Sequence, residues 1–279
     1  MSVTSAPAAA DTFPRLLSKH ATQRPDAPAL REKYLGIWQT WSWHDTAAEV
    51  RAMAMGLAAL GFKRGDNLAI IGDNRPQLYM AFAAAQSLGG VAVPMYQDAV
   101  AAEMTFVLEN AVIRFAIVED QEQVDKLLEA RDSLPQIEHI IYADPRGLRN
   151  YDASGLMSLE ALRTKGDEFD AAQPGFFDAQ VAAGKATDVS VMLYTSGTTG
   201  KPKGVCQTHE AFITAASGGV QFDHLVATDN VLSYLPMAWV GDHLFSYAQF
   251  LVAGFTVNCP ESAETVMTDL REIGPTYYF

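Results

Sequence analysis

The feature that most constrains the fold is a regular alternation of short apolar segments with longer, helix-like segments between residues 67 and 142. Each apolar segment has about the length of a buried strand, and each segment between them has about the length of a short helix. The expected strands are Asn67–Ile71, Gly90–Pro94, Arg114–Val118 and Glu138–Tyr142, and the expected helices are Pro76–Leu88, Ala99–Asn110 and Gln121–Arg131. This rhythm predicts an α/β fold, with a parallel-rich β-sheet flanked by helices.

The segments before this alternation have simpler local signals. Phe13–Lys33 is typical of a short helix followed by an extended stretch, and Tyr34–Trp43 of a hairpin. Ser42 and Asp45 have the spacing of a capping box, which predicts a helix that runs to Leu60. Residues 1–11 are rich in Ala, Ser and Pro and are expected to be a disordered lead-in.

The second half of the chain departs from the regular rhythm. Residues 145–185 are expected to be a connection within one domain, with a short helix near Ser158–Arg163. Further on, we expect helices at His209–Ser217, Trp239–Ala253 and Ala263–Ile273 and strands at Asn230–Tyr234, Phe255–Asn258 and from Thr276. Thr276–Phe279 begins an apolar, β-prone strand at the end of the sequence. Since such a segment has to be buried, whereas chain ends usually lie at the surface, we expect residues 12–279 to be an incomplete large domain.

A polar loop between apolar segments is the strongest functional signal. Val189–Tyr194 is typical of a buried strand, and the chain becomes apolar again at Val205. The residues between them are Thr195, Ser196, Gly197, Thr198, Thr199, Gly200, Lys201, Pro202, Lys203 and Gly204. Glycines let backbone N–H groups approach a ligand, hydroxyls add donors, and lysines supply charges suited to phosphate oxygens. The loop therefore predicts a polyphosphate site.

Three other interpretations of this loop are weaker. It lacks the Walker A spacing, because Gly197 and Gly200 are too close and Pro202 follows Lys201, which disfavours a phosphate-loop NTPase. A plain surface turn needs neither this density of donors nor two lysines. No Gly-x-Ser-x-Gly elbow surrounds Ser196, so a hydrolase nucleophile is disfavoured.

Bulk composition narrows the range of possible binding partners. The net charge of −13 disfavours nucleic acid and anionic membrane surfaces. The two cysteines, Cys206 and Cys259, have no metal-ligand spacing; Cys206 is interpreted as a buried filler, and a reducing cytoplasm fits. The apolar runs 79–96 and 239–257 are interrupted by polar residues, glycine or proline, so no transmembrane segment is expected; peripheral membrane contact stays open.

The loop also resembles a known family. Tyr194–Val205 is similar to the phosphate-binding signature of the adenylate-forming (AMP-binding) superfamily. Gly72–Pro76, Gly89–Tyr96, Leu235–Trp239 and Ile273–Thr276 resemble segments of long-chain fatty acyl-CoA synthetases. The resemblance implies the N-terminal part of such an enzyme's large domain. It implies activation of a carboxylic acid with ATP and Mg²⁺, followed by transfer of the acyl group to CoA.

Residue roles follow from the same resemblance. Thr198 and Lys201 are implied as catalytic residues. The implied ATP-binding residues are Thr195, Ser196, Gly197, Thr198, Thr199, Gly200, Lys201 and Lys203. Trp239 stands where the family has a histidine near the acyl carboxylate, and His243, one helical turn further on, is the second implied substrate-binding residue. The ligands of the metal stay unknown.

Several alternatives stay open. Judged from the residues alone, the favoured interpretation is that His243 caps or lines a buried polar spot, since adjacent helical residues such as Asp242 and His243 point apart. The substrate alternatives are medium-chain or aryl acids, with an acyl carrier protein as alternative acceptor. A non-catalytic nucleotide-binding or scaffold role is the alternative from another class.

Overall fold

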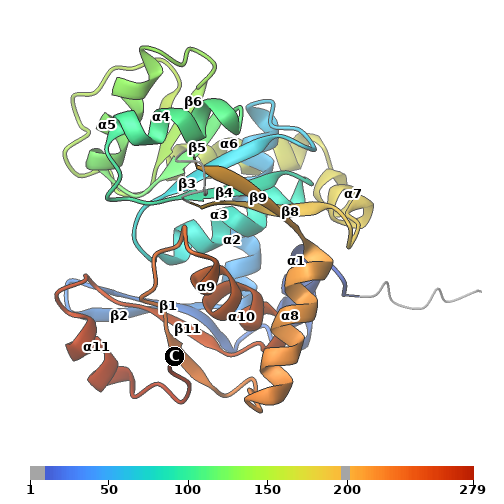
Figure 1. Ribbon diagram of the computed structural model, residues 1–279. Coiled ribbons are helices and arrows are strands. Elements are labelled where there is room, and N and C mark those ends of the chain that lie inside the picture. Colours follow the sequence, from blue (N-terminus) through green and yellow to red (C-terminus); the bar gives the residue numbers. More distant parts are fainter. Residues whose placement is uncertain (1–9, 196–201) are drawn as a thin grey trace, which may run out of the picture.

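The computed structural model describes residues 10–195 and 202–279, which form two β-sheets with helices around and between them (Figure 1). In the larger sheet all neighbouring strands are parallel except the last pair, β8 and β9. Its strand order is β7 (Leu156–Ser158), β6 (His139–Tyr142), β5 (Phe115–Val118), β3 (Asn67–Ile71), β4 (Val91–Met95), β8 (Val189–Thr195) and β9 (Lys203–Thr208). The predicted α/β class is confirmed.

The predicted alternation is confirmed in the parallel part of this sheet. Helices α3 (Pro76–Ser87), α4 (Ala101–Asn110) and α5 (Gln121–Arg131) connect β3, β4, β5 and β6. Strand β3 shows why these strands are apolar throughout. Its residues Leu68 and Ile70 belong to a core with α2 and α3, whereas Ala69 and Ile71 belong to a core with α4 and α5. Alternate side chains therefore enter cores on opposite faces of the sheet.

The smaller sheet joins segments that are far apart in the sequence. Its strand order is β10 (Asn230–Leu232), β11 (Thr256–Cys259), β1 (Pro28–Tyr34) and β2 (Ile37–Ser42). Strand β1 is parallel to β11 and antiparallel to β2, so the predicted hairpin is confirmed. Its turn places Leu35 and Gly36 at φ +48° and +76°, the mirror-image geometry of tight hairpins.

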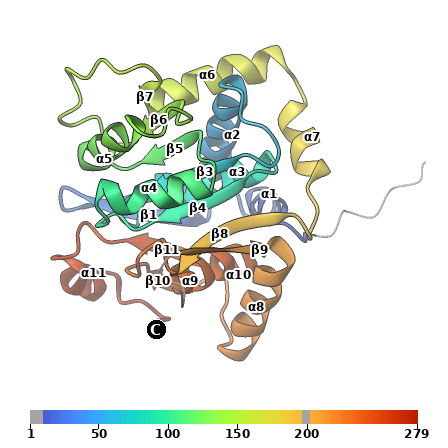
Figure 2. The ribbon, with the colours of Figure 1, turned by 45° about the horizontal axis from the view of Figure 1, so that its top comes forward.

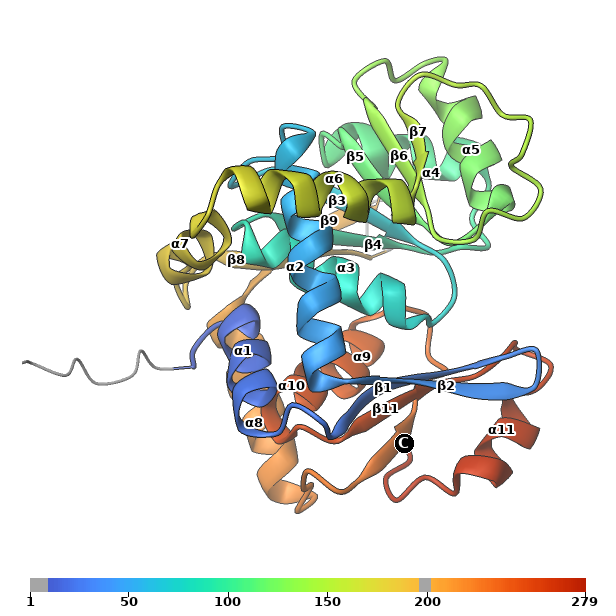
Figure 3. The same ribbon diagram turned by 180° about the vertical axis from the view of Figure 1, so that it is seen from behind.

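The helix after this hairpin, α2 (Trp43–Ala59), begins with the predicted capping box. The Asp45 amide donates to Ser42 Oγ at 3.1 Å, and the Ser42 amide donates to Asp45 Oδ2 at 3.0 Å. Figure 3 shows α2 running from the larger sheet toward the smaller one, with α3 between the two sheets. Helix α2 thus links the two layers.

The prediction for residues 145–185 is wrong in detail. In place of one short helix the chain forms α6 (Leu159–Ala172) and α7 (Phe176–Ala183), with β7 before them. Helix α6 packs closely on α2 through glycines, since a Cβ atom at Gly166 would lie 1.9 Å from the Ala52 carbonyl oxygen. This contact is tertiary and leaves little periodic signal. Cys206 is also corrected: it is exposed, because β9 is an edge strand.

The remaining helices are α1 (Phe13–Gln23), α8 (His209–Phe222), α9 (Val240–Asp242), the π-helix η1 (His243–Ala248), α10 (Gln249–Ala253) and α11 (Val266–Ile273). The predicted helix Trp239–Ala253 thus exists with a π-helical middle. Figure 2 shows α8 and α10 side by side next to the β8–β9 pair. At the expected last strand, Tyr277 forms an isolated parallel bridge with Val231. The predicted disorder of residues 1–11 falls mostly outside the described residues.

In the part of the chain that the structure describes, no helix combines the length and the apolar character needed to cross a membrane.

Candidate functional site

The polar loop joins β8 to β9, and the structure places the two ends of the loop side by side. Thr195 ends β8 and pairs with Lys203, the first residue of β9. Both side chains are exposed, and Lys203 forms no ion pair with any described residue. Tyr194 Oη donates to Asn110 Oδ1 at 2.6 Å, which anchors the base of the loop to α4. The other loop residues, Ser196, Gly197, Thr198, Thr199, Gly200 and Lys201, lie outside the described residues.

An apolar cavity of about 520 Å³ opens beside the loop ends. It lies at the carboxyl ends of β4 and β8, against helix α4. Its lining includes Met95, Met104, Phe106, Val107, Thr195, Pro202 and Ala238. In open parallel sheets, ligands bind outside the carboxyl ends of the strands. Ala238 belongs to the segment Leu235–Asp242, so this segment shares a wall with the loop ends.

Asp242, at the end of that segment, is buried in a compact polar network. Its side chain accepts hydrogen bonds from Tyr79 Oη at 2.8 and 3.0 Å and from Asn74 Nδ2 at 3.0 Å. Asn74 Nδ2 also lies 3.0 Å from the Leu235 carbonyl oxygen and 2.8 Å from Tyr79 Oη. Burial raises the pKa of Asp242 to about 7.

His243, the next residue, faces a different environment. Its ring centroid lies 4.6 Å from that of Phe212, 5.0 Å from that of Tyr247 and 5.3 Å from that of Phe82. Neither ring nitrogen has a hydrogen-bond partner among the described residues, and burial lowers the pKa of His243 to about 3. The histidine is therefore neutral near pH 7. Trp239, in contrast, is 45% exposed.

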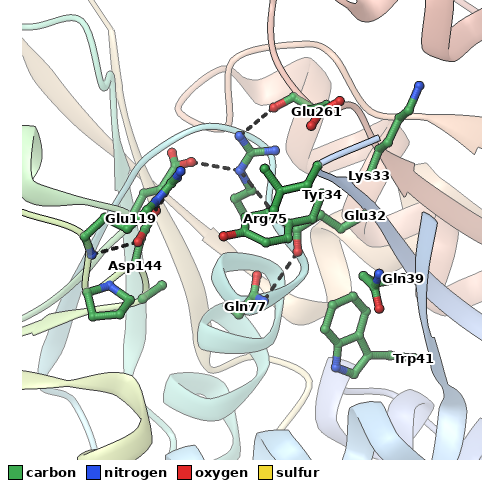
Figure 4. Close-up of a pocket in the computed structure, with 14 residues that line it drawn as sticks. Glu32, Lys33, Tyr34, Gln39, Trp41, Arg75, Gln77, Glu119, Asp144 and Glu261 are labelled. Carbon is green, nitrogen blue, oxygen red and sulfur yellow. Dashed lines mark hydrogen bonds and ion pairs between the residues drawn. The ribbon is translucent and has the colours of Figure 1, made fainter. Parts of the chain in front are cut away.

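A second cavity, of about 620 Å³, lies between the β1–β2 hairpin and the loops that follow β5 and β6 (Figure 4). Its charged side chains mostly bind protein groups. Arg75 Nε donates to Glu119 at 2.8 Å, and its terminal nitrogens donate to the backbone oxygens of Pro260 and Glu261 at 2.7 and 2.9 Å. Arg146 pairs with Asp144. We therefore place the candidate site at the loop and the apolar cavity beside it.

The donor chemistry at the loop suits a phosphate ligand, because Lys203 offers an exposed charge and Thr195 a hydroxyl next to it. A metal site is a separate matter. Within residues 10–195 and 202–279, no group of three or more His, Cys, Asp or Glu side chains is placed to hold a metal ion. The described residues therefore assign no ligand to magnesium.

Comparison with known proteins identifies the family. The family model described as AMP-binding enzyme matches residues 17–279, which is nearly the whole chain. The chain belongs to the AMP-binding enzyme family. The predicted resemblance to adenylate-forming enzymes is therefore confirmed.

Two curated relatives are long-chain-fatty-acid–CoA ligases. The chain is 29% identical to FadD15 of Mycobacterium bovis over 254 residues, covering 88% of this chain and 40% of that protein. It is 28% identical to ACSBG2 of Xenopus laevis over 275 residues, covering 96% of this chain and 36% of that protein. The chain thus spans well under half the length of these AMP-binding relatives.

Solved structures support the fold of the AMP-binding family. The adenylation domain of a carboxylate reductase from Mycobacterium chelonae has a TM-score of 0.79 at 20% identity, over 98% of this chain and 46% of that chain. A fatty acyl-adenylate ligase from L. pneumophila, in complex with acyl adenylate and pyrophosphate, has a TM-score of 0.70 at 17% identity, over 95% and 42%. At these identities the comparison concerns the fold alone.

Sequence reasoning missed the part played by Asn74 and Tyr79. The segment Gly72–Pro76 resembled the family, but no role followed for its residues. Gly72 has φ +156°, and a Cβ atom there would lie 2.5 Å from Glu119 Cβ, so the position requires glycine. A glycine followed by polar residues directly after a buried strand was the available signal, because that is where side chains of a parallel sheet meet ligands or other elements.

Proposed function

We propose that this chain is part of an ATP-dependent ligase that converts a carboxylic acid, of the long-chain fatty class, into an acyl-adenylate and then transfers it to CoA. One observation carries the proposal: an apolar cavity shares its wall with both ends of the phosphate-binding loop. Such a juxtaposition suits an acid with an apolar chain next to ATP. The long-chain-fatty-acid names of the curated relatives support the substrate class.

In the first step a carboxylate oxygen attacks the α-phosphorus of ATP, the bond to the β-phosphate breaks, and pyrophosphate leaves. In the second step the thiol of CoA attacks the acyl carbon, and AMP leaves. The protein contributes positioning and charge neutralisation. Lys201 and Thr198 would hold the β- and γ-phosphates, with Thr195, Ser196, Gly197, Thr199, Gly200 and Lys203 completing the cradle. Bound magnesium would neutralise phosphate charge.

On the acid side, we infer that Trp239 and His243 belong to the substrate site. Ala238, which lines the apolar cavity, adjoins Trp239 and supports this placement. Residues 12–279 would form part of one large domain. The two cysteines are free, which is compatible with a reducing cytoplasm as the place of the reaction.

The test is acid-dependent exchange of radiolabelled pyrophosphate into ATP, measured on the natural gene product that contains this sequence. Replacing Thr198→Ala together with Lys201→Ala should lower the exchange rate by about a hundredfold or more, since removing preorganised donors costs this much in comparable sites. The thermal unfolding midpoint should stay unchanged. Unchanged exchange would remove the loop from the mechanism.

A panel of acids and acceptors separates the alternatives. Preference for medium-chain or aryl acids, or for an acyl carrier protein over CoA, would change the proposed substrate or acceptor but leave the proposed ligase reaction in place. ATP binding without acid-dependent pyrophosphate release would identify a nucleotide-binding scaffold. Hydrolysis of ATP that needs no acid would indicate an NTPase.

A further inference from the structure

Three residues without an assigned role meet inside the molecule. Asn74 lies in the turn after β3, Tyr79 lies on α3, and Asp242 ends the segment Leu235–Asp242. Their side chains are within hydrogen-bond distance of one another, at 2.8 to 3.0 Å. All three are deeply buried, with exposed fractions of 8%, 2% and 1%. Short hydrogen bonds to a carboxyl group inside a protein hold their partners firmly.

The network joins two layers of the fold. Asn74 and Tyr79 belong to the β3–α3 unit of the larger sheet, whereas the segment Leu235–Asp242 follows β10 of the smaller sheet. Asn74 contacts both ends of that segment, the Leu235 carbonyl oxygen and the Asp242 carboxyl group. The segment is thereby held at its first and last residues.

The held segment faces the candidate site. Ala238 lies in its middle and lines the apolar cavity together with the loop ends, Thr195 and Pro202. Pro236, two residues earlier, lines a separate cavity of about 380 Å³ beside Asn74. The segment is thus a partition between two cavities, and the buried Met237 side chain also packs it against the hydrophobic core. A shift of this partition would change the shape of the apolar cavity more than the position of the loop.

We propose that Asn74, Tyr79 and Asp242 form a buried clamp that positions the segment Leu235–Asp242 and thereby sets the affinity for the carboxylic acid. These are positioning residues, because none of them lines the apolar cavity. The effect on acid affinity rests on the proposed function, whereas the clamp itself does not. Since the predicted ATP-binding loop belongs to the β8–β9 hairpin and not to this segment, we expect the affinity for ATP to be independent of the clamp.

The test combines two measurements on the natural gene product. Tyr79→Phe removes a single hydroxyl, and Asp242→Ala removes the shared acceptor. Both should speed hydrogen exchange of the amides in residues 235–243, where the Trp239 amide donates to the Pro236 oxygen at 2.9 Å. Both should also raise KM for the acid by about tenfold or more, and change KM for ATP by less than about twofold.

Two further variants separate positioning from general damage. Asp242→Asn keeps an acceptor and the side-chain shape, so it should restore most of the acid affinity that Asp242→Ala loses. Tyr151→Phe is the matched control, because it removes a tyrosine-to-aspartate hydrogen bond of 2.7 Å, to Asp125, away from the site. This control should change neither KM nor exchange in residues 235–243.

The outcomes are distinct. Unchanged hydrogen exchange in residues 235–243 would overturn the clamp, whatever the activity. Faster exchange with equal increases of KM for the acid and for ATP would overturn its selective effect on the acid. A wild-type protein without acid-dependent pyrophosphate exchange would contradict the proposed function, and hydrogen exchange would then still decide whether the clamp exists.

Discussion

The loop between β8 and β9 and the adjacent pair Asp242 and His243 both interrupt apolar sequence with polar residues, yet the fold places the two regions in opposite environments. Thr195 and Lys203, at the ends of the hairpin loop, are exposed and offer their polar groups outward. Asp242 and His243 are each 1% exposed, and their side chains contact buried protein groups such as Tyr79 and Phe212. A polar cluster in a sequence therefore does not reveal whether its partner is a ligand or another part of the chain.

The largest expected effect on stability lies in the buried segment. Asp242→Ala leaves the buried Tyr79 hydroxyl without its acceptor and removes one of the acceptors of the Asn74 amide, which should lower the free energy of unfolding by about 3 kcal/mol. Urea denaturation at neutral pH measures this change. Lys203→Ala, the exposed counterpart, should leave the free energy of unfolding unchanged. Similar losses for the two variants would break the contrast between the regions.

The pH dependence of stability should sharpen the same contrast. In the unfolded chain His243 takes up a proton below about pH 6.5, whereas in the folded protein burial lowers its pKa to about 3. At His243 the unfolded state thus binds more protons between these values, so the contribution of His243 to stability falls as the pH decreases through this window, whereas Asp242, whose pKa burial raises to about 7, contributes in the opposite direction. His243→Leu should remove the His243 contribution and thereby change the slope of the free energy of unfolding against pH by up to the equivalent of about one bound proton.

Denaturant titrations between pH 7 and pH 4 measure this slope. Burial also lowers the pKa of His209 to about 4, so the variant keeps the contribution of His209, which has the same sign. An unchanged slope would contradict the neutral, buried state of His243. The same variant also tests the proposed substrate role, which predicts a selective rise in KM for the acid, and an unchanged KM would contradict that role.

The smallest expected effect belongs to the exposed region. Lys203→Ala removes one charge at the edge of the phosphate loop, where water screens it, so KM for ATP should rise by about threefold. Steady-state kinetics at low and at high salt measure the change, and the difference between wild type and variant should shrink at high salt. A rise in KM for the acid without a rise in KM for ATP would contradict the assignment of Lys203 to the ATP-binding residues.

Local and periodic features of the fold could be predicted from the sequence. The capping box of Ser42 and Asp45, the hairpin before it and the alternation over residues 67–142 depend on neighbouring residues, and the structure confirms each of them. The position of the polar loop between two strands could also be predicted, because apolar runs bracket Thr195 and Val205.

Long-range features could not be predicted in this way. The pairing of Leu30 with Val257 and the glycine contact between α2 and α6 depend on residues that share no local pattern. The burial of Asp242 with Asn74 and Tyr79 is of the same kind, because no local pattern links these three residues. For the candidate site, the sequence indicated the polar loop, whose phosphate ligand stays a prediction, and gave no sign of the network of Asn74, Tyr79 and Asp242.

The most direct test of the central claim is acid-dependent exchange of pyrophosphate into ATP by the natural gene product, with a long-chain fatty acid supplied. We expect exchange that requires the acid and that falls by about a hundredfold in the Thr198→Ala, Lys201→Ala double variant, whose fold stays intact. Exchange that is absent with every acid, or that persists in the double variant, would contradict the account.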